Sequence, residues 1–110
     1  MLERLSLVVL GQRRQFPGGS EPFKMVTRLA EECGEVAAEV QRWEGEGLKR
    51  AKHGPADRSS MAKELMDLLT CALTIVEHYG LGDDLRARIE LSISRATEDG
   101  WLTPDEASPG

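Results

Sequence analysis

The sequence predicts an all-α protein, a compact bundle of about four helices that associates with further copies of itself. In four segments, apolar residues recur every three to four positions, which is the period of a helix with one buried face. No segment alternates apolar and polar residues as a half-buried strand does. Glycine and proline interrupt the helical pattern between these segments, and each interruption is typical of a helix end.

The first helix is expected from residue 2 to about residue 15, because Leu5 and Val9 lie one turn apart within an apolar stretch. Residues 16–19, Phe-Pro-Gly-Gly, end it, since proline and paired glycines do not continue a helix cheaply. The second helix is expected over residues 21–45. It carries most of the acidic residues that bear on function.

Residues 45–59 are expected to form a long loop, because three glycines and a proline break any period there. A third helix follows, from about residue 60 to Tyr79-Gly80, and a fourth covers residues 83–99 with Gly100 as its stop. Residues 101–110 include two prolines and are expected to be a loosely ordered tail.

Composition indicates a single soluble domain over residues 1–110, because this length is close to the commonest domain size. A hydrophobic content of 40% and a charged content of 30% are typical of globular chains. The net charge of −5 gives no general attraction to nucleic acid or to an anionic membrane. The two cysteines fall within helical patterns and suit a reduced, cytoplasmic protein.

Two pairs of acidic residues stand out within the apolar pattern. Glu32 and Glu35 lie three residues apart in the second helix, and Glu64 and Asp67 repeat that spacing in the third. On a helical wheel, each pair falls to the same side of an apolar stripe. The stripes are residues 26, 29, 33, 36 and 40 in one helix and residues 65, 69, 72 and 76 in the other.

If these stripes pack against each other, four carboxylates meet at one shared edge. Neither helix supplies basic residues at the spacing that an exposed acidic face would use, so the carboxylates repel one another without a cation. A hard divalent cation with oxygen ligands is the natural occupant. The competing interpretation, a solvated helix face, is the usual one for a single acidic pair.

The chain resembles the MazG-like, all-α nucleotide pyrophosphohydrolases. Glu31-Glu32-Cys33-Gly34-Glu35 followed by Glu64-Leu65-Met66-Asp67 matches the EExxE…ExxD signature of that family, and the similarity covers roughly residues 20–100. The resemblance implies hydrolysis of nucleoside triphosphates to monophosphates and pyrophosphate, as housecleaning of the nucleotide pool. It also implies assembly as a homodimer or homotetramer.

The same resemblance implies a magnesium site, with manganese as a possible substitute. Glu32, Glu35, Glu64 and Asp67 match the family's metal-binding positions, and Glu31 is the candidate for positioning or deprotonating the attacking water. The candidate substrate-binding residues are cations, a hydroxyl and an aromatic ring: Arg88, Ser92 and Arg95, which are spaced like the family's Lys-x-x-x-Asn-x-x-Arg pattern, together with Lys52 and Trp43.

Three alternatives stay open. A phosphoribosyl-ATP pyrophosphohydrolase of histidine biosynthesis has similar acidic motifs, but its serine-tyrosine-threonine segment upstream of the acids is missing here. A ferritin-like di-iron protein uses Glu-x-x-His, and neither His53 nor His78 follows a glutamate by three residues. A non-enzymatic helical interaction module would tolerate alanine at Glu32 and Glu35.

Overall fold

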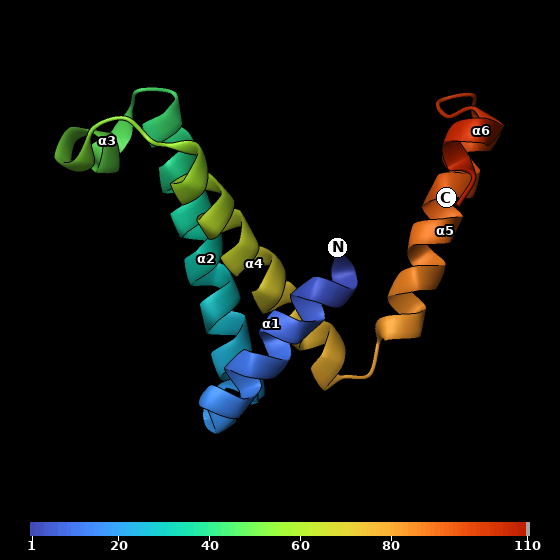
Figure 1. Ribbon diagram of the computed structural model, residues 1–110, viewed down its shortest axis with the longest axis horizontal. Helices are drawn as coiled ribbons and strands as arrows, with labels where there is room; N and C mark the ends of the chain where they lie inside the picture. The colour runs from blue at the N-terminus through green and yellow to red at the C-terminus, as the bar shows by residue number, and fades with distance from the viewer. Residues whose placement is uncertain (110) are drawn as a thin grey trace. The chain divides into compact units, whose positions relative to one another are not determined.

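The computed structural model describes residues 1–109, and these form helices and turns without a β-strand. The helices follow one another along the chain (Figure 1): α1 (Leu2–Gln15), η1 (Pro17–Ser20), α2 (Pro22–Trp43), α3 (Gly47–His53), α4 (Arg58–His78), α5 (Gly82–Glu98) and α6 (Pro104–Ala107), of which η1 is a 3-10 helix. The all-α prediction is confirmed. Four long helices occupy the predicted positions, and α3 and α6 are additional short helices within the described residues.

The chain divides into two compact units, Met1–His78 and a second that begins at Tyr79. The first unit is built on α2 and α4, which lie side by side in Figure 1. They run antiparallel, because Ser60 contacts Glu39 whereas Asp67, about two turns later on α4, lies beside Glu32. α1 packs against α4 and α3 packs against α2.

The start of α2 is fixed by its local sequence. Pro22 occupies the first helical position, where its missing N–H costs nothing and its fixed φ favours the helix. The Glu21 carboxylate accepts hydrogen bonds from the backbone amides of Phe23 and Lys24 at 3.2 and 3.1 Å. These contacts satisfy two amides that have no partner inside the helix, and they fix where the acidic face of α2 begins.

The predicted buried stripes of α2 and α4 are wrong. Met25 and Glu39 are buried on α2, whereas Val26 and Val40 on the predicted stripe are 60% and 46% exposed. The buried line follows residues 25, 32 and 39, a seven-residue spacing typical of helices that pack at a small angle. Because one residue is about 100° of helix rotation, this line turns Glu32 toward α4.

On α4, the predicted stripe is likewise not the buried one. Thr70 and Cys71 are buried, whereas Leu69 of the predicted stripe is 47% exposed. The physical reason is that polar and charged groups occupy the inner faces of α2 and α4: Glu39 accepts a hydrogen bond from Ser60, and Glu32 lies beside Glu64 and Asp67. The apolar side chains therefore lie beside the contact between the helices instead of within it.

The segment predicted as a loop over residues 45–59 contains α3, so that prediction is wrong at its centre. Leu48-Lys49-Arg50-Ala51-Lys52 consists of good helix formers. Glycines set both ends: Gly45 and Gly47 have φ values of +84°, and Gly54 has a φ of +74° while its amide donates to the Arg50 carbonyl at 2.8 Å. The glycines thus border a short helix, which the sequence pattern concealed.

The second unit consists of α5 and α6, which contact each other. Within the segment predicted as a tail, Thr103 and Glu106 form a reciprocal capping box at the start of α6; Gly110, the last residue of that segment, lies outside the described residues. Across residues 1–109, each helix falls short of the length or apolar content that a membrane span requires.

Candidate metal centre

Three of the predicted acids converge between α2 and α4. Glu32 of α2 and Glu64 and Asp67 of α4 each offer a carboxylate oxygen, and these oxygens lie within 4.8 Å of one another. Glu64 and Asp67 come from neighbouring turns of α4, and all three residues are half-buried. We call Glu32, Glu64 and Asp67 the acidic cluster.

The acidic cluster lacks full compensation by positive charge. Burial raises the pKa of Glu32 above its ordinary value of 4.5, and the neighbouring Asp67 and Glu64 carboxylates raise it further. Two lysines contact the cluster: Lys63 Nζ lies 2.8 Å from an oxygen of Asp67, and Lys49 Nζ lies 3.7 Å from an oxygen of Glu64. Lys63 precedes Asp67 by four residues on α4, so the expectation that neither helix supplies a basic partner at this spacing is wrong. The hydrogen bond to Asp67 raises the pKa of Lys63. An additional cation within the cluster would relieve the remaining repulsion.

Carboxylate oxygens are the donors that Mg²⁺ and Mn²⁺ prefer. The acidic cluster therefore fits a hard divalent cation by the chemistry of its donor set. It does not fit a site that needs imidazole or thiolate ligands, because the three converging groups are all carboxylates.

Glu39 is the buried acid that sequence analysis left without a role. Its side chain is 0% exposed, and each oxygen has a partner: Oε1 accepts from the Ser60 hydroxyl at 2.7 Å, and Oε2 lies 2.6 Å from Lys49 Nζ. The hydrogen bonds from Lys49 and Ser60 lower the pKa of Glu39. Its position seven residues after Glu32 was the available signal, because residues at that spacing share a helix face.

Lys49 joins this buried pair to the acidic residues. Its Nζ lies 3.7 Å from a Glu64 oxygen and 3.8 Å from a Glu35 oxygen, in addition to its contact with Glu39. The hydrogen bond with Glu39 raises the pKa of Lys49, and the Glu64 and Glu35 charges act in the same direction. Lys49 lies in the segment predicted as a loop over residues 45–59, and only α3 shows that it points inward.

Arg42 anchors the end of α3. Its guanidinium donates to the carbonyls of Gly54, His53 and Pro55 at 2.8, 3.2 and 3.0 Å. It also lies 3.5 Å from Glu39 Oε1. Through Arg42, the last turn of α2 fixes the position of α3, and thereby that of Lys49.

The other predicted residues are spread over the two units. Glu31 and Glu35 are exposed on α2, and Glu35 lies beside Lys49 instead of within the acidic cluster. Lys52 is exposed on α3. Arg88, Ser92 and Arg95 are exposed along one face of α5 in the second unit, where the Ser92 hydroxyl donates to the Arg88 carbonyl at 3.0 Å.

Trp43 borders a groove where the end of α2 meets the start of α4. The groove has a volume of about 470 Å³, and its other lining residues come from α4: Arg58, Ser59, Met61, Ala62 and Leu65. This volume falls within the range of small-molecule sites. Leu65 directly follows Glu64 in the chain.

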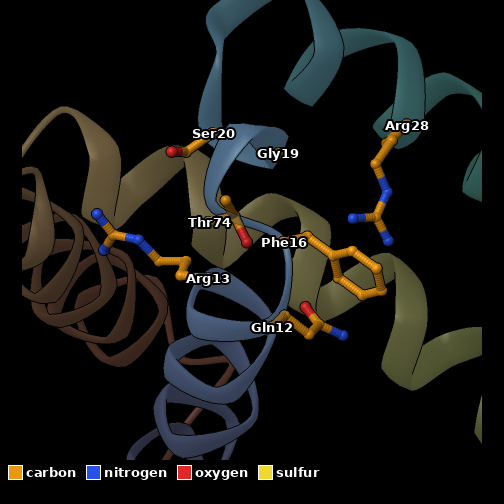
Figure 2. A pocket seen from close by; sticks show the side chains of 7 residues that line it. All are labelled: Gln12, Arg13, Phe16, Gly19, Ser20, Arg28 and Thr74. Carbon is orange, nitrogen blue, oxygen red and sulfur yellow. The ribbon is translucent and has the colours of Figure 1, made fainter.

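A second cavity lies where α1, η1, α2 and α4 meet (Figure 2). Its lining residues are Gln12, Arg13, Phe16, Gly19, Ser20, Arg28 and Thr74. In Figure 2, the Arg28 guanidinium points toward the Phe16 ring. The cavity volume of about 20 Å³ is enough for a water molecule but not for a nucleotide.

The fold and this site define an all-helical protein with a carboxylate cluster between two antiparallel helices. The family model of the MazG nucleotide pyrophosphohydrolase domain matches residues 21–94. The chain therefore belongs to the MazG nucleotide pyrophosphohydrolase family, as its acidic motifs indicated. The match extends from the start of α2 into α5, and it includes all three residues of the acidic cluster.

One relative is the uncharacterized protein YpjD from Bacillus subtilis (strain 168). It is 29% identical over 98 residues, which cover 88% of this chain and 84% of the relative. The likeness thus extends over most of both chains. No solved structure gives a significant match.

Proposed function

We propose that this protein hydrolyses nucleoside triphosphates between the α and β phosphates, releasing a nucleoside monophosphate and pyrophosphate. The observation that carries the proposal is the convergence of Glu32, Glu64 and Asp67 within the part of the chain that the family model matches. A non-enzymatic interaction module has no need of three carboxylates packed at mutual distances of 4.8 Å or less.

We propose Glu32, Glu64 and Asp67 as direct ligands of Mg²⁺, which Mn²⁺ can replace. Glu35, the fourth predicted ligand, is proposed to lie beside the ion and to pair with Lys49. Magnesium bound there supplies charge neutralisation for the phosphates and a more acidic bound water. The carboxylates hold the ion on rigid helices, so that it keeps free positions for water and phosphate oxygens.

The remaining roles are proposed for residues outside the acidic cluster. Glu31 is exposed one residue before Glu32 and is proposed to orient or deprotonate the attacking water. Trp43 is proposed to stack on the base from its groove, and Lys52 to contact phosphate. Arg88 and Arg95 are proposed to bind phosphate oxygens, with Ser92 as a further hydrogen-bonding group.

We also propose that the functional protein is a homodimer or a homotetramer of such dimers. Val26 and Val40 follow the buried Met25 and Glu39 by one position, and Leu65 follows Glu64 by one. Because α2 and α4 run antiparallel, these residues point to the same side of both helices, and Leu69 lies one turn after Leu65 on that side. This side carries exposed apolar residues, which we call the apolar face: Val26, Val40, Leu65 and Leu69. A second copy of the chain is the proposed occupant of the apolar face.

The cell compartment that we propose is the cytoplasm. Cys33 and Cys71 are both free thiols, which a reducing compartment maintains. The proposed role is the removal of unwanted nucleotides from the cellular pool.

The experiment that tests the activity is a panel of canonical and modified nucleoside triphosphates, incubated with protein and Mg²⁺ or Mn²⁺. Release of pyrophosphate together with the monophosphate is expected for at least one substrate, and EDTA is expected to abolish it. Folded protein that leaves every substrate intact would contradict the proposal. Including phosphoribosyl-ATP in the panel tests the histidine-pathway alternative directly.

A further inference from the structure

Lys49 is a cation built into the acidic region. Its ammonium lies 2.6 Å from Glu39, 3.7 Å from Glu64 and 3.8 Å from Glu35. These three carboxylates come from two helices, α2 and α4, whereas the lysine comes from α3. Lysines that reach solvent freely rarely meet three carboxylates at once, so this contact needs a structural explanation.

The position of the ammonium is fixed from both sides. Glu39 is 0% exposed and cannot turn away, because Ser60 and Arg42 hold its other oxygen at 2.7 and 3.5 Å. Arg42 also holds the end of α3 through three backbone carbonyls. The backbone that carries Lys49 is thus held in place, and withdrawal of the ammonium would leave the buried Glu39 without it.

The acids consequently form two overlapping groups. Glu32, Glu64 and Asp67 offer oxygens to one point, whereas Glu35, Glu39 and Glu64 surround the ammonium. Glu64 belongs to both groups. A second divalent cation at Glu35 and Glu64 would have to share their oxygens with the ammonium and would be repelled by its charge.

We propose that the Lys49 ammonium takes the place of a second divalent cation, so that the protein without nucleotide binds one metal ion per chain. This inference rests on the proposed function, because it assumes that the acidic cluster holds a metal. It goes further in two ways: Glu35 and Glu39 are partners of the Lys49 ammonium instead of metal ligands, and each chain binds a single metal ion. In this arrangement Lys49 is a positioning residue.

The test is Mn²⁺ binding to the full-length chain without nucleotide, with free Mn²⁺ measured by electron paramagnetic resonance. The wild type is expected to bind one ion per chain. Lys49→Gln, which frees Glu35 and Glu64, is expected to bind two, and Lys49→Arg, which keeps the charge, is expected to bind one. Arg50→Gln is the matched control: it removes a cation from the same helix, and Arg50 forms no ion pair within residues 1–109.

Lys49→Gln leaves the buried Glu39 charge without its ammonium, which endangers folding. The double variant Glu39→Gln/Lys49→Gln removes both charges and keeps two hydrogen-bonding amides. It is also expected to bind two ions, because the Glu35 and Glu64 carboxylates remain. A wild type that binds two ions, or a folded double variant that binds one, would overturn the role of Lys49.

The same titration distinguishes this inference from the proposed function. Suppose that the wild type binds one ion and hydrolyses nucleotides. If Lys49→Gln and the double variant also bind one ion each, only the role of Lys49 is wrong. If the wild type binds no Mn²⁺ and releases no pyrophosphate, the metal centre itself is wrong, and the inference fails with it.

Discussion

Glu39 and Glu32 show how two glutamates on one helix face acquire opposite properties. Glu39 is fully buried, yet its contacts with Lys49 and Ser60 lower its pKa. Glu32 is half-buried, and burial together with two neighbouring carboxylates raises its pKa. The first residue is a satisfied structural charge, whereas the second is a charge that still needs a cation.

Asp67→Asn is expected to lower pyrophosphate release by about 100-fold or more, because it removes a charged ligand from the proposed metal centre. The fold should be retained, since a carboxamide has the same shape as the carboxylate that it replaces. Circular dichroism and a thermal melt check the fold, and a pyrophosphate assay checks the rate. Glu44→Gln, an exposed acid at the end of α2, is the control; equal rates in Asp67→Asn and the wild type would disprove the ligand assignment.

Glu39 is expected to make stability dependent on acid. The pKa of Glu39 is lower in the folded chain than the ordinary 4.5. Between these two pKa values the unfolded chain therefore binds more protons than the folded chain. The stabilisation is therefore complete above pH 4.5 and is lost as the pH falls through the folded pKa. Urea unfolding at pH 7 and near pH 3.5 measures this loss.

Glu39→Gln should unfold at a lower urea concentration than the wild type at pH 7, because Lys49 is then left without its nearest carboxylate. Its midpoint should also fall less between the two pH values, since the titrating group is gone. A variant whose midpoint fell as steeply as that of the wild type would show that other carboxylates cause the acid sensitivity.

At the scale of helices, periodicity located α1, α2, α4 and α5 but misplaced the faces by which α2 and α4 pack. The search for an apolar stripe selected Val26 and Leu69, which are exposed, because hydrophobicity alone assumes an apolar contact. The actual contact includes Glu32, Glu39 and Thr70. The buried Glu39 charge is satisfied largely by Ser60 of α4 and Lys49 of α3. Such pairing depends on residues far apart in sequence, which a one-dimensional pattern does not contain.

α3 was missed for a related reason. Seven residues between glycines are too few to show an amphipathic period. What stabilises the helix is tertiary: the Arg42 guanidinium donates hydrogen bonds to three carbonyls at its end, and Lys49 anchors its inner side. Of the four predicted acids, by contrast, Glu32, Glu64 and Asp67 do lie together, because a spacing of three residues is a local property of a helix, whereas Glu35 lies beside Lys49.

Arg42→Ala is expected to loosen α3 specifically. Hydrogen bonds to a charged donor each contribute about 1.5–3 kcal/mol, and since the three bonds are not additive we expect a loss of about 2–4 kcal/mol in unfolding free energy. Amides of residues 47–53 should exchange hydrogen faster than the global loss of stability explains. Amides in the middle of α4 should change only by that global amount. Arg50→Ala is the control, and unchanged exchange in α3 after Arg42→Ala would contradict its anchoring role.

For the whole molecule, the displaced stripes explain why the chain should associate. Burying Glu32 and Glu39 between α2 and α4 moves Val26, Val40, Leu65 and Leu69 to the apolar face. A single chain has few buried apolar side chains in its first unit: Leu5, Val9, Met25 and Cys71. A small core together with an exposed apolar face is typical of a chain that completes its interior by self-association.

Leu69→Lys is therefore expected to weaken the dimer. Burial of a leucine side chain contributes about 1.5–3 kcal/mol, so the dissociation constant should rise at least about tenfold for each interface that contains it. Light scattering after size-exclusion chromatography, over a range of protein concentrations, measures the change. Leu7→Lys is the matched control, because Leu7 is an exposed leucine of α1 that lies outside the apolar face. Dissociation by Leu7→Lys but not by Leu69→Lys would move the interface from α2 and α4 to α1, and a monomeric wild type would exclude it altogether.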